Sequence, residues 1–98
     1  MNREQLITTL RSHETELRRR GVRHAALFGS QARGDATPAS DVDVLIDLDP
    51  DAAISIFDYA RLKRYISDLF PDRVDVINRA ALKPALRDNA TADAVRAF

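Results

Sequence analysis

The stretch Gly29-Ser30-Gln31-Ala32-Arg33-Gly34-Asp35-Ala36-Thr37-Pro38-Ala39-Ser40-Asp41-Val42-Asp43 predicts more about the fold of this 98-residue chain than any other segment. An apolar run, Val22–Phe28, leads into it, and an alternating apolar run, Val42–Leu48, leads out of it. Short runs of this kind, bounded by glycine, aspartate and proline, are typical of β-strands. The stretch therefore places a Gly-Ser turn at the end of one predicted strand and an Asp-x-Asp pair at the start of the next.

The flanking sequence predicts two helices beside these strands. Apolar residues at helical spacing predict a first helix over about 3–20, with Gly21 as its C-terminal cap. A second helix begins near Ser55, which has capping-box spacing to Asp58, and Pro71 stops it. The apolar positions that support the two helices are Leu6, Ile7, Leu10, Leu17, Phe57, Leu62, Tyr65, Ile66 and Leu69.

The last part of the chain predicts one more strand and one more helix. Residues 73–77 form a short apolar run around a single acid, which predicts a strand. Residues 82–98 have a composition typical of a helix, in which Pro84 is tolerated because it lies in the first turn. The predicted fold class is α+β, a two-layer arrangement of a small mixed sheet of about three strands with helices packed against it. We expect one domain that spans residues 1–98.

Three aspartates in this arrangement have the chemistry of a metal site. The spacing of Asp41 and Asp43 places both carboxylates on one face of a strand, where they repel each other unless a cation lies between them. Mg²⁺ prefers such oxygen ligands. Asp75 lies in the apolar third strand, where an unpaired acid is costly. If that strand lies beside the second, Asp75 completes a three-carboxylate cluster that can hold two Mg²⁺ ions about 3.5–4 Å apart.

The Gly-Ser turn has the chemistry of a phosphate-binding loop. Gly29 allows a tight turn at the end of the first strand, and the residues after it can open a short helix. The free N–H groups of that helix, the Ser30 hydroxyl and Arg33 suit the β- and γ-phosphates of a nucleotide. Gly34 lets the chain leave the loop without a side chain in the way.

Each of these features alone has an ordinary structural explanation. An isolated Asp-x-Asp is usually solvated surface, and an isolated Gly-Ser is usually a turn, so the prediction depends on their ordered combination. The arginine run 18–20 is interpreted as a solvated helix end, and Asp47, Asp49 and Asp51 as a solvated acidic turn. His24 has no second histidine or cysteine at ligand spacing, which argues against a zinc site.

The composition limits the class of protein. Fifteen basic and fifteen acidic residues give a formal net charge of zero, which argues against direct binding of nucleic acid through bulk electrostatics. The absence of cysteine excludes disulfides and thiolate metal sites and fits the cytosol. The N-terminal residues are polar and no run reaches membrane-spanning length, so we expect a soluble cytoplasmic protein without a membrane partner.

The pattern of Gly-Ser, ten residues, Asp-x-Asp and a later strand acid resembles the nucleotidyltransferase superfamily that includes DNA polymerase beta. The run GSQARGDATPASDVDVLIDLD is most similar to the minimal nucleotidyltransferases, small bacterial and archaeal proteins that are often the antitoxin of a HEPN-domain toxin. The resemblance covers nearly the whole chain. Asp75 stands where the family has its third acid, and Asp72 is the weaker candidate. Matches to the motif are found at Gly29, Ser30, Arg33, Gly34, Ser40, Asp41 and Asp43.

The resemblance implies Mg²⁺-dependent transfer of AMP from ATP to a protein hydroxyl, with pyrophosphate as the leaving group. In toxin–antitoxin members the acceptor is a tyrosine of the partner toxin. By this resemblance Asp41 and Asp43 bind two metal ions, and Asp75 binds the catalytic ion and helps to deprotonate the acceptor. The residues implied to hold the triphosphate are Gly29, Ser30 and Arg33.

Two other functions fit the same sequence. The chain could neutralise a toxin by contact alone, or it could be the subunit of a transferase that modifies a small molecule. Because 98 residues leave no room for a separate acceptor-binding domain, we expect a hetero-oligomer with a helical HEPN toxin. Leu86, Val95 and Phe98 are candidate contacts for that partner, although an apolar helical stripe more often packs on its own domain.

Overall fold

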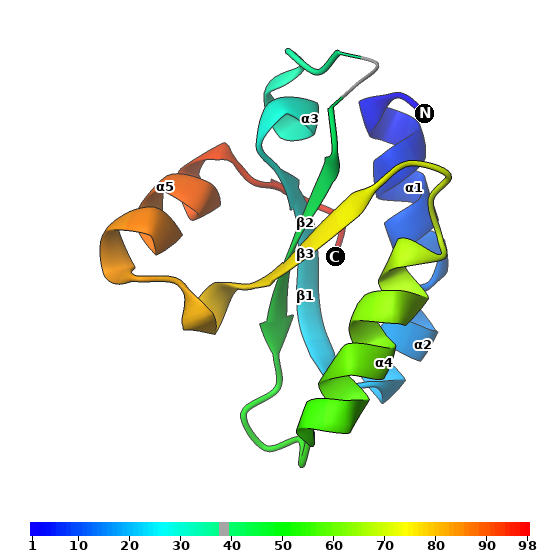
Figure 1. The fold of residues 1–98 in the computed structure, drawn as a ribbon, viewed down its shortest axis with the longest axis vertical. Coiled ribbons are helices and arrows are strands. Elements are labelled where there is room, and N and C mark those ends of the chain that lie inside the picture. The colour runs from blue at the N-terminus through cyan, green and yellow to red at the C-terminus, as the bar shows by residue number, and fades with distance from the viewer. Residues whose placement is uncertain (38–39) are drawn as a thin grey trace.

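The computed structural model describes residues 1–37 and 40–98, and its helices lie on both sides of a central sheet (Figure 1). Pro38 and Ala39, within the predicted phosphate-loop stretch, lie outside the described residues. The elements in chain order are α1 (Arg3–Ser12), α2 (Glu14–Arg19), β1 (Val22–Phe28), α3 (Ser30–Arg33), β2 (Val42–Leu48), α4 (Ile56–Ser67), β3 (Val74–Asn78), the 3-10 helix η1 (Arg79–Ala81), α5 (Pro84–Asp93) and β4 (Val95–Arg96).

The sheet is mixed and has the strand order β3-β2-β1-β4. β1 pairs antiparallel with β2 and with β4, whereas β3 pairs parallel with β2. The predicted fold class is therefore confirmed, and the predicted bounds of β1 and β2 agree with the structure. The prediction of about three strands was one too few, because the helix expected over 82–98 ends at Asp93 and the chain then joins the sheet as β4.

One face of the sheet is buried under α1, α2 and α4, and α5 lies on the other side (Figure 1). Val42, Val44 and Ile46 alternate toward the buried face and are fully inaccessible to solvent. They contact the apolar stripes of the helices, and each buried leucine or isoleucine there contributes about 1.5–3 kcal/mol. The fully buried helical members of this core are Leu6, Leu10, Leu17, Leu62 and Ile66.

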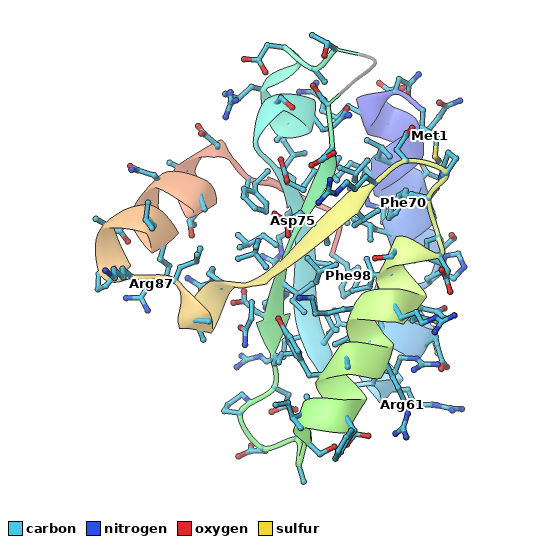
Figure 2. All side chains as sticks on the ribbon, viewed as in Figure 1. Met1, Arg61, Phe70, Asp75, Arg87 and Phe98 are labelled. Carbon is cyan, nitrogen blue, oxygen red and sulfur yellow. The ribbon has the colours of Figure 1, made fainter. Side chains whose placement is uncertain are left out.

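The alternation along β2 leaves Asp43, Leu45 and Asp47 on the opposite face. Asp75 of β3 shares this face, because its neighbour Val76 is buried in the core. Figure 2 shows Asp75 on the side of the sheet away from α1 and α4, and Phe98 between the sheet and α4. The positions of Asp43 and Asp75, two of the three predicted metal ligands, are thus set by a strand register that the hydrophobic core fixes.

The first predicted helix is broken at His13 into α1 and α2. His13 has φ −107° and ψ 13°, and its ring Nδ1 lies 2.8 Å from the Thr9 carbonyl oxygen. The Ser12 hydroxyl also donates to that carbonyl, at 2.8 Å. Side-chain hydrogen bonds to nearby backbone groups compete with the backbone hydrogen bonds of a helix. The break at His13 could not be predicted, because the apolar residues keep helical spacing on both sides of it.

Three apolar side chains lie elsewhere than predicted. Phe57, assigned to the buried stripe of α4, is 71% exposed because it lies in the first turn of the helix. Val95 and Phe98, considered as partner contacts, pack against the chain's own core. Leu86 is 57% exposed on α5 and remains a candidate contact. Within the described residues, no helix is both long and apolar enough to span a membrane.

Replacing Ser55 by alanine should destabilise the fold by about 1 kcal/mol. The Ser55 hydroxyl accepts a hydrogen bond from the Asp58 N–H at 3.1 Å, and the Asp58 carboxylate accepts one from the Ser55 N–H. Urea unfolding followed by circular dichroism measures the change. Ser67→Ala at the far end of α4 is the control, and an equal loss of stability in both variants would contradict the role of this cap.

Candidate active site

Asp43 and Asp75 lie directly opposite each other on neighbouring parallel strands. Adjacent strands are about 4.8 Å apart, and both side chains project from the same face of the sheet, so the two carboxylates share one small region. Asp41 lies just before β2 and two residues from Asp43. The sequence predicted a cluster of the three acids only if the third strand paired with the second. The structure has this pairing between β3 and β2, and it brings Asp75 beside Asp43.

The shared environment is unfavourable for a carboxylate at Asp43. Partial burial raises the pKa of Asp43 above its ordinary value, and repulsion from Asp75 and then from Asp41 raises it further. Arg33 lowers the pKa of Asp43 but does not cancel these effects. The site therefore gathers negative charge for which a cation is the natural partner.

Gly29 is required by the position of Asp43. Its backbone has φ +71°, and a Cβ at this position would lie 2.5 Å from the Asp43 Oδ2 atom. Any side chain here would push the carboxylate away and would also strain the backbone. Because Phe28 pairs with Asp43 across β1 and β2, the Gly-Ser turn and the central acid are held against each other by the sheet.

Ser30 opens the short helix α3, as predicted, and Gly34 ends it in the left-handed conformation with φ +82°. Arg33 lies at the end of α3 and is exposed. Its Nε lies 3.3 Å from the Asp35 Oδ2, and its Nη1 lies 3.5 Å from the Asp93 Oδ2 on α5. Asp35 is the main cause of the raised pKa of Arg33. A phosphate that binds Arg33 therefore competes with two carboxylates.

The predicted ligands fit a divalent cation by their chemistry. Carboxylate oxygens are what Mg²⁺ prefers, and Asp41 and Asp75 are exposed side chains that change rotamer freely. Within residues 1–37 and 40–98, no three acidic, histidine or cysteine side chains are placed so that they already enclose an ion.

Two contacts near the site had no signal in the sequence. Asp47, interpreted as part of a solvated turn, lies within β2, and its Oδ1 accepts a hydrogen bond from the Arg79 Nε at 2.6 Å. The Arg3 guanidinium donates to the Ala32 carbonyl in α3 at 3.0 Å. Both contacts join residues about thirty positions apart, so no local pattern predicts them.

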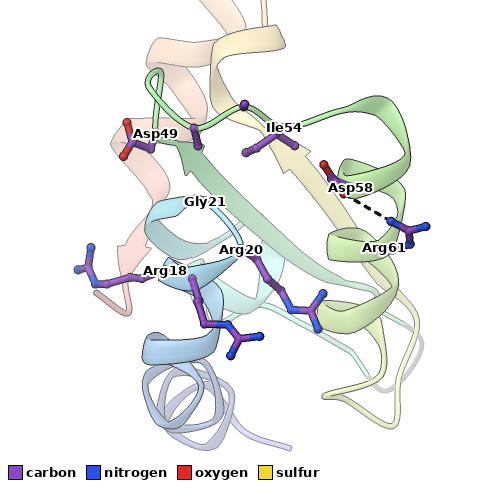
Figure 3. Close-up of a pocket in the computed structure, with 10 residues that line it drawn as sticks. Arg18, Arg20, Gly21, Asp49, Ile54, Asp58 and Arg61 are labelled. Atoms are coloured by element: carbon purple, nitrogen blue, oxygen red, sulfur yellow. Dashed lines mark hydrogen bonds and ion pairs between the residues drawn. The ribbon is translucent and has the colours of Figure 1, made fainter.

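The arginine run lies at the end of the sheet opposite the acids. It borders a hollow of about 370 Å³ together with Gly21 and Ile54 (Figure 3). Arg18 pairs with Glu14 at 2.7 Å, and Arg20 pairs with Glu16 at 3.1 Å. The Arg18–Glu14 pair is exposed, as expected for a solvated helix end, whereas the Arg20–Glu16 pair is partly buried and Arg20 also lies over the Tyr65 ring.

Comparisons with known proteins agree with this geometry. Residues 10–97 match the family model of the nucleotidyltransferase domain, and the chain belongs to this family. It is a nucleotidyltransferase that resembles protein adenylyltransferase MntA of Thermococcus cleftensis, with 37% identity over 85% of this chain and 83% of the relative.

Solved structures show the same relationship. One assigned to the minimal nucleotidyltransferases superimposes with a TM-score of 0.80 and 32% identity, over 97% of this chain and 95% of the other. The crystal structure of a toxin–antitoxin with AMP-PNP superimposes with a TM-score of 0.68 and 16% identity, over 100% of this chain and 73% of the other, and shows a shared fold.

Replacing Asp43 by asparagine should raise the thermal midpoint at pH 7 by a few degrees. An acid whose pKa is raised on folding binds more protons in the folded state, so ionisation at pH 7 disfavours folding and the amide removes that penalty. The gain should narrow as the pH falls toward the ordinary aspartate pKa of about 3.9. Thermal unfolding as a function of pH measures it.

Asp88→Asn on α5 is the matched control, since it removes one exposed carboxylate outside the acidic cluster. An equal gain in both variants would attribute the effect to net charge. A loss of stability in Asp43→Asn would contradict the repulsion.

Proposed function

We propose that this nucleotidyltransferase transfers AMP from ATP to the hydroxyl group of a tyrosine in a partner HEPN toxin. It thereby acts as the antitoxin of that partner. The observation that carries the proposal is the placement of Asp43 opposite Asp75 and against Gly29, with Asp41 two residues before. This arrangement joins an acidic cluster to a loop suited to phosphates. We place the reaction in the cytoplasm, and we take residues 1–98 as one minimal nucleotidyltransferase domain.

The acids have separate roles in this proposal. Asp41 and Asp43 would hold two Mg²⁺ ions, which when bound supply charge stabilisation for the attacking and leaving oxygens. Asp75 would share an ion and accept the proton of the acceptor hydroxyl. The hydroxyl oxygen forms a bond to the α-phosphorus, the bond between the α-phosphorus and the bridging oxygen breaks, and pyrophosphate leaves with the electron pair.

The loop would hold the triphosphate. Ser30 begins α3 directly after Gly29, and Arg33 supplies a cation at the end of the same short helix. The pairing of Phe28 with Asp43 places this loop beside the acids, and the absence of a Cβ at Gly29 leaves room for the Asp43 carboxylate. Such an arrangement orients the α-phosphorus toward an acceptor that approaches Asp75.

The proposal of a toxin partner has support from the relatives. MntA of Thermococcus cleftensis is a protein adenylyltransferase, and one structure with the same fold is a toxin–antitoxin with AMP-PNP. This chain has a formal net charge of zero, which favours a protein acceptor over nucleic acid. The first experiment is co-expression with a candidate HEPN-domain partner, followed by size-exclusion chromatography and intact mass spectrometry after incubation with ATP and Mg²⁺.

The proposal requires that the partner's mass rises by whole AMP units. A stable complex with no mass change would instead indicate an antitoxin that acts by contact alone. Neither complex nor mass change would indicate a small-molecule acceptor.

Transfer should be lost in Asp41→Ala and Asp43→Ala, and Asp75→Asn should lose transfer more than it loses nucleotide binding. The first two changes remove ligands of both ions, whereas Asp75 lies on a separate strand beside the predicted acceptor. Labelled ATP and the partner protein provide the assay, with circular dichroism to check folding. Wild-type transfer by Asp75→Asn would redirect the assignment of the third acid to Asp72.

Nucleotide affinity should fall in Ser30→Ala and in Arg33→Ala while the fold is retained. Each change removes one phosphate contact, worth about 1.5–3 kcal/mol when charge-assisted. Isothermal titration with Mg²⁺ and a non-hydrolysable ATP analogue measures the loss. Arg87→Ala on α5 removes a similar charge away from the loop, and unchanged affinity in both loop variants would mean that the loop is only a turn.

A further inference from the structure

The helix α3 is too short to be stable without contacts to the rest of the chain. It spans four residues, Ser30–Arg33, and its closing backbone hydrogen bonds run from the Arg33 N–H to the Gly29 oxygen at 3.1 Å and from the Gly34 N–H to the Ser30 oxygen at 3.0 Å. A single helical turn is unstable in isolation, and the carbonyls at its end need partners outside it. The position of the loop therefore depends on contacts with the rest of the chain.

Arg3 provides such a contact from a distant part of the sequence. Its Nη1 donates to the Ala32 carbonyl at 3.0 Å, across 29 residues and in a partly buried position. The Ala32 side chain itself is only 4% exposed and belongs to the hydrophobic core. One side of α3 is thus anchored by packing, and the carbonyl end is anchored by the guanidinium.

The Arg3 backbone is itself held rigidly. Asn2 caps α1 by accepting a hydrogen bond from the Gln5 N–H at 2.8 Å, and the Gln5 side chain accepts one from the Asn2 N–H at 2.9 Å. Leu6, three residues after Arg3, is fully buried and ties this end of α1 to the core. In Figure 1 the start of α1 lies at the same end of the molecule as α3. Arg3 therefore connects a fixed helix to a short one.

We infer that Arg3 is a positioning residue for the nucleotide, which holds α3 at the distance from Asp43 that the triphosphate requires. This inference rests on the proposed role of the loop. Arg3 does not contact the acids or the substrate; it orients the Ser30 hydroxyl and the loop N–H groups by fixing the Ala32 carbonyl. Losing this contact should lower affinity for the nucleotide because the loop must then be ordered on binding.

The chain offers a matched control on the same helix. Arg11 also donates from its side chain to a distant backbone carbonyl, from Nε to the Ala97 oxygen at 2.8 Å and across 86 residues. Its partner lies in the C-terminal segment beside β1 and not in the loop. Arg3→Met and Arg11→Met each remove one such bond and keep an unbranched side chain, so they separate positioning from general stability.

The test compares Arg3→Met, Arg3→Lys and Arg11→Met. Isothermal titration with Mg²⁺ and a non-hydrolysable ATP analogue should show about tenfold weaker binding in Arg3→Met, most of it restored in Arg3→Lys, and wild-type binding in Arg11→Met. Hydrogen exchange without nucleotide should show faster exchange of the hydrogen-bonded amides at 33–35 in Arg3→Met alone. Urea unfolding should show comparable losses of stability in the two methionine variants.

Unchanged exchange of the amides at 33–35 in Arg3→Met would overturn the inference, whatever the affinity. Equal nucleotide affinity in Arg3→Met and Arg11→Met, with Ser30→Ala weakened, would also overturn it. Faster exchange in Arg3→Met together with unchanged affinity in Ser30→Ala would support the tether but refute the phosphate-binding role of the loop, so the two failures are distinguishable.

Discussion

The candidate site depends on one constraint: the Asp43 carboxylate lies so close to Gly29 that a Cβ at this position would displace it. Antiparallel pairing sets Phe28 opposite Asp43, so the chain must turn away directly beside the acid. There is no room for a Cβ at this turn, and the positive φ of Gly29 also favours glycine. The Gly-Ser turn and Asp43 are therefore one structural unit, built from the ends of two neighbouring strands.

Gathering acids in this way has a cost that the rest of the fold must offset. Asp43 is partly buried and repelled by Asp75 and Asp41, which raises its pKa and disfavours the ionised folded state. Domains of this size are stable by only about 5–15 kcal/mol, so each such penalty matters. The buried face of the same strand supplies the compensation, because Val42, Val44 and Ile46 are completely inaccessible to solvent. Along β2, the residues of the candidate site therefore alternate with the residues that pack into the core.

The parts of the structure that the sequence predicted are those fixed by local chemistry. The bounds of β1 and β2 follow from glycine, aspartate and proline around short apolar runs, and the cap at Ser55 follows from its spacing to Asp58. The ion pair of Asp47 with Arg79 and the bond of Arg3 to Ala32 could not be predicted, because each depends on how distant segments pack. The strand β4 is two residues long, which is too short to produce a periodic pattern.

The sheet topology also determines how an acceptor can reach the site in the proposed reaction. One face is filled by α1, α2 and α4, so a substrate must approach the other face, on which Asp43 and Asp75 lie. β3 is the edge strand in the order β3-β2-β1-β4, and Asp75 is exposed there. An acceptor hydroxyl can therefore approach Asp75 from beyond the edge of the sheet, while the triphosphate occupies the loop that follows β1. In the proposed reaction, donor and acceptor would then reach Asp43 from its two neighbouring strands, the donor beside β1 and the acceptor beside β3.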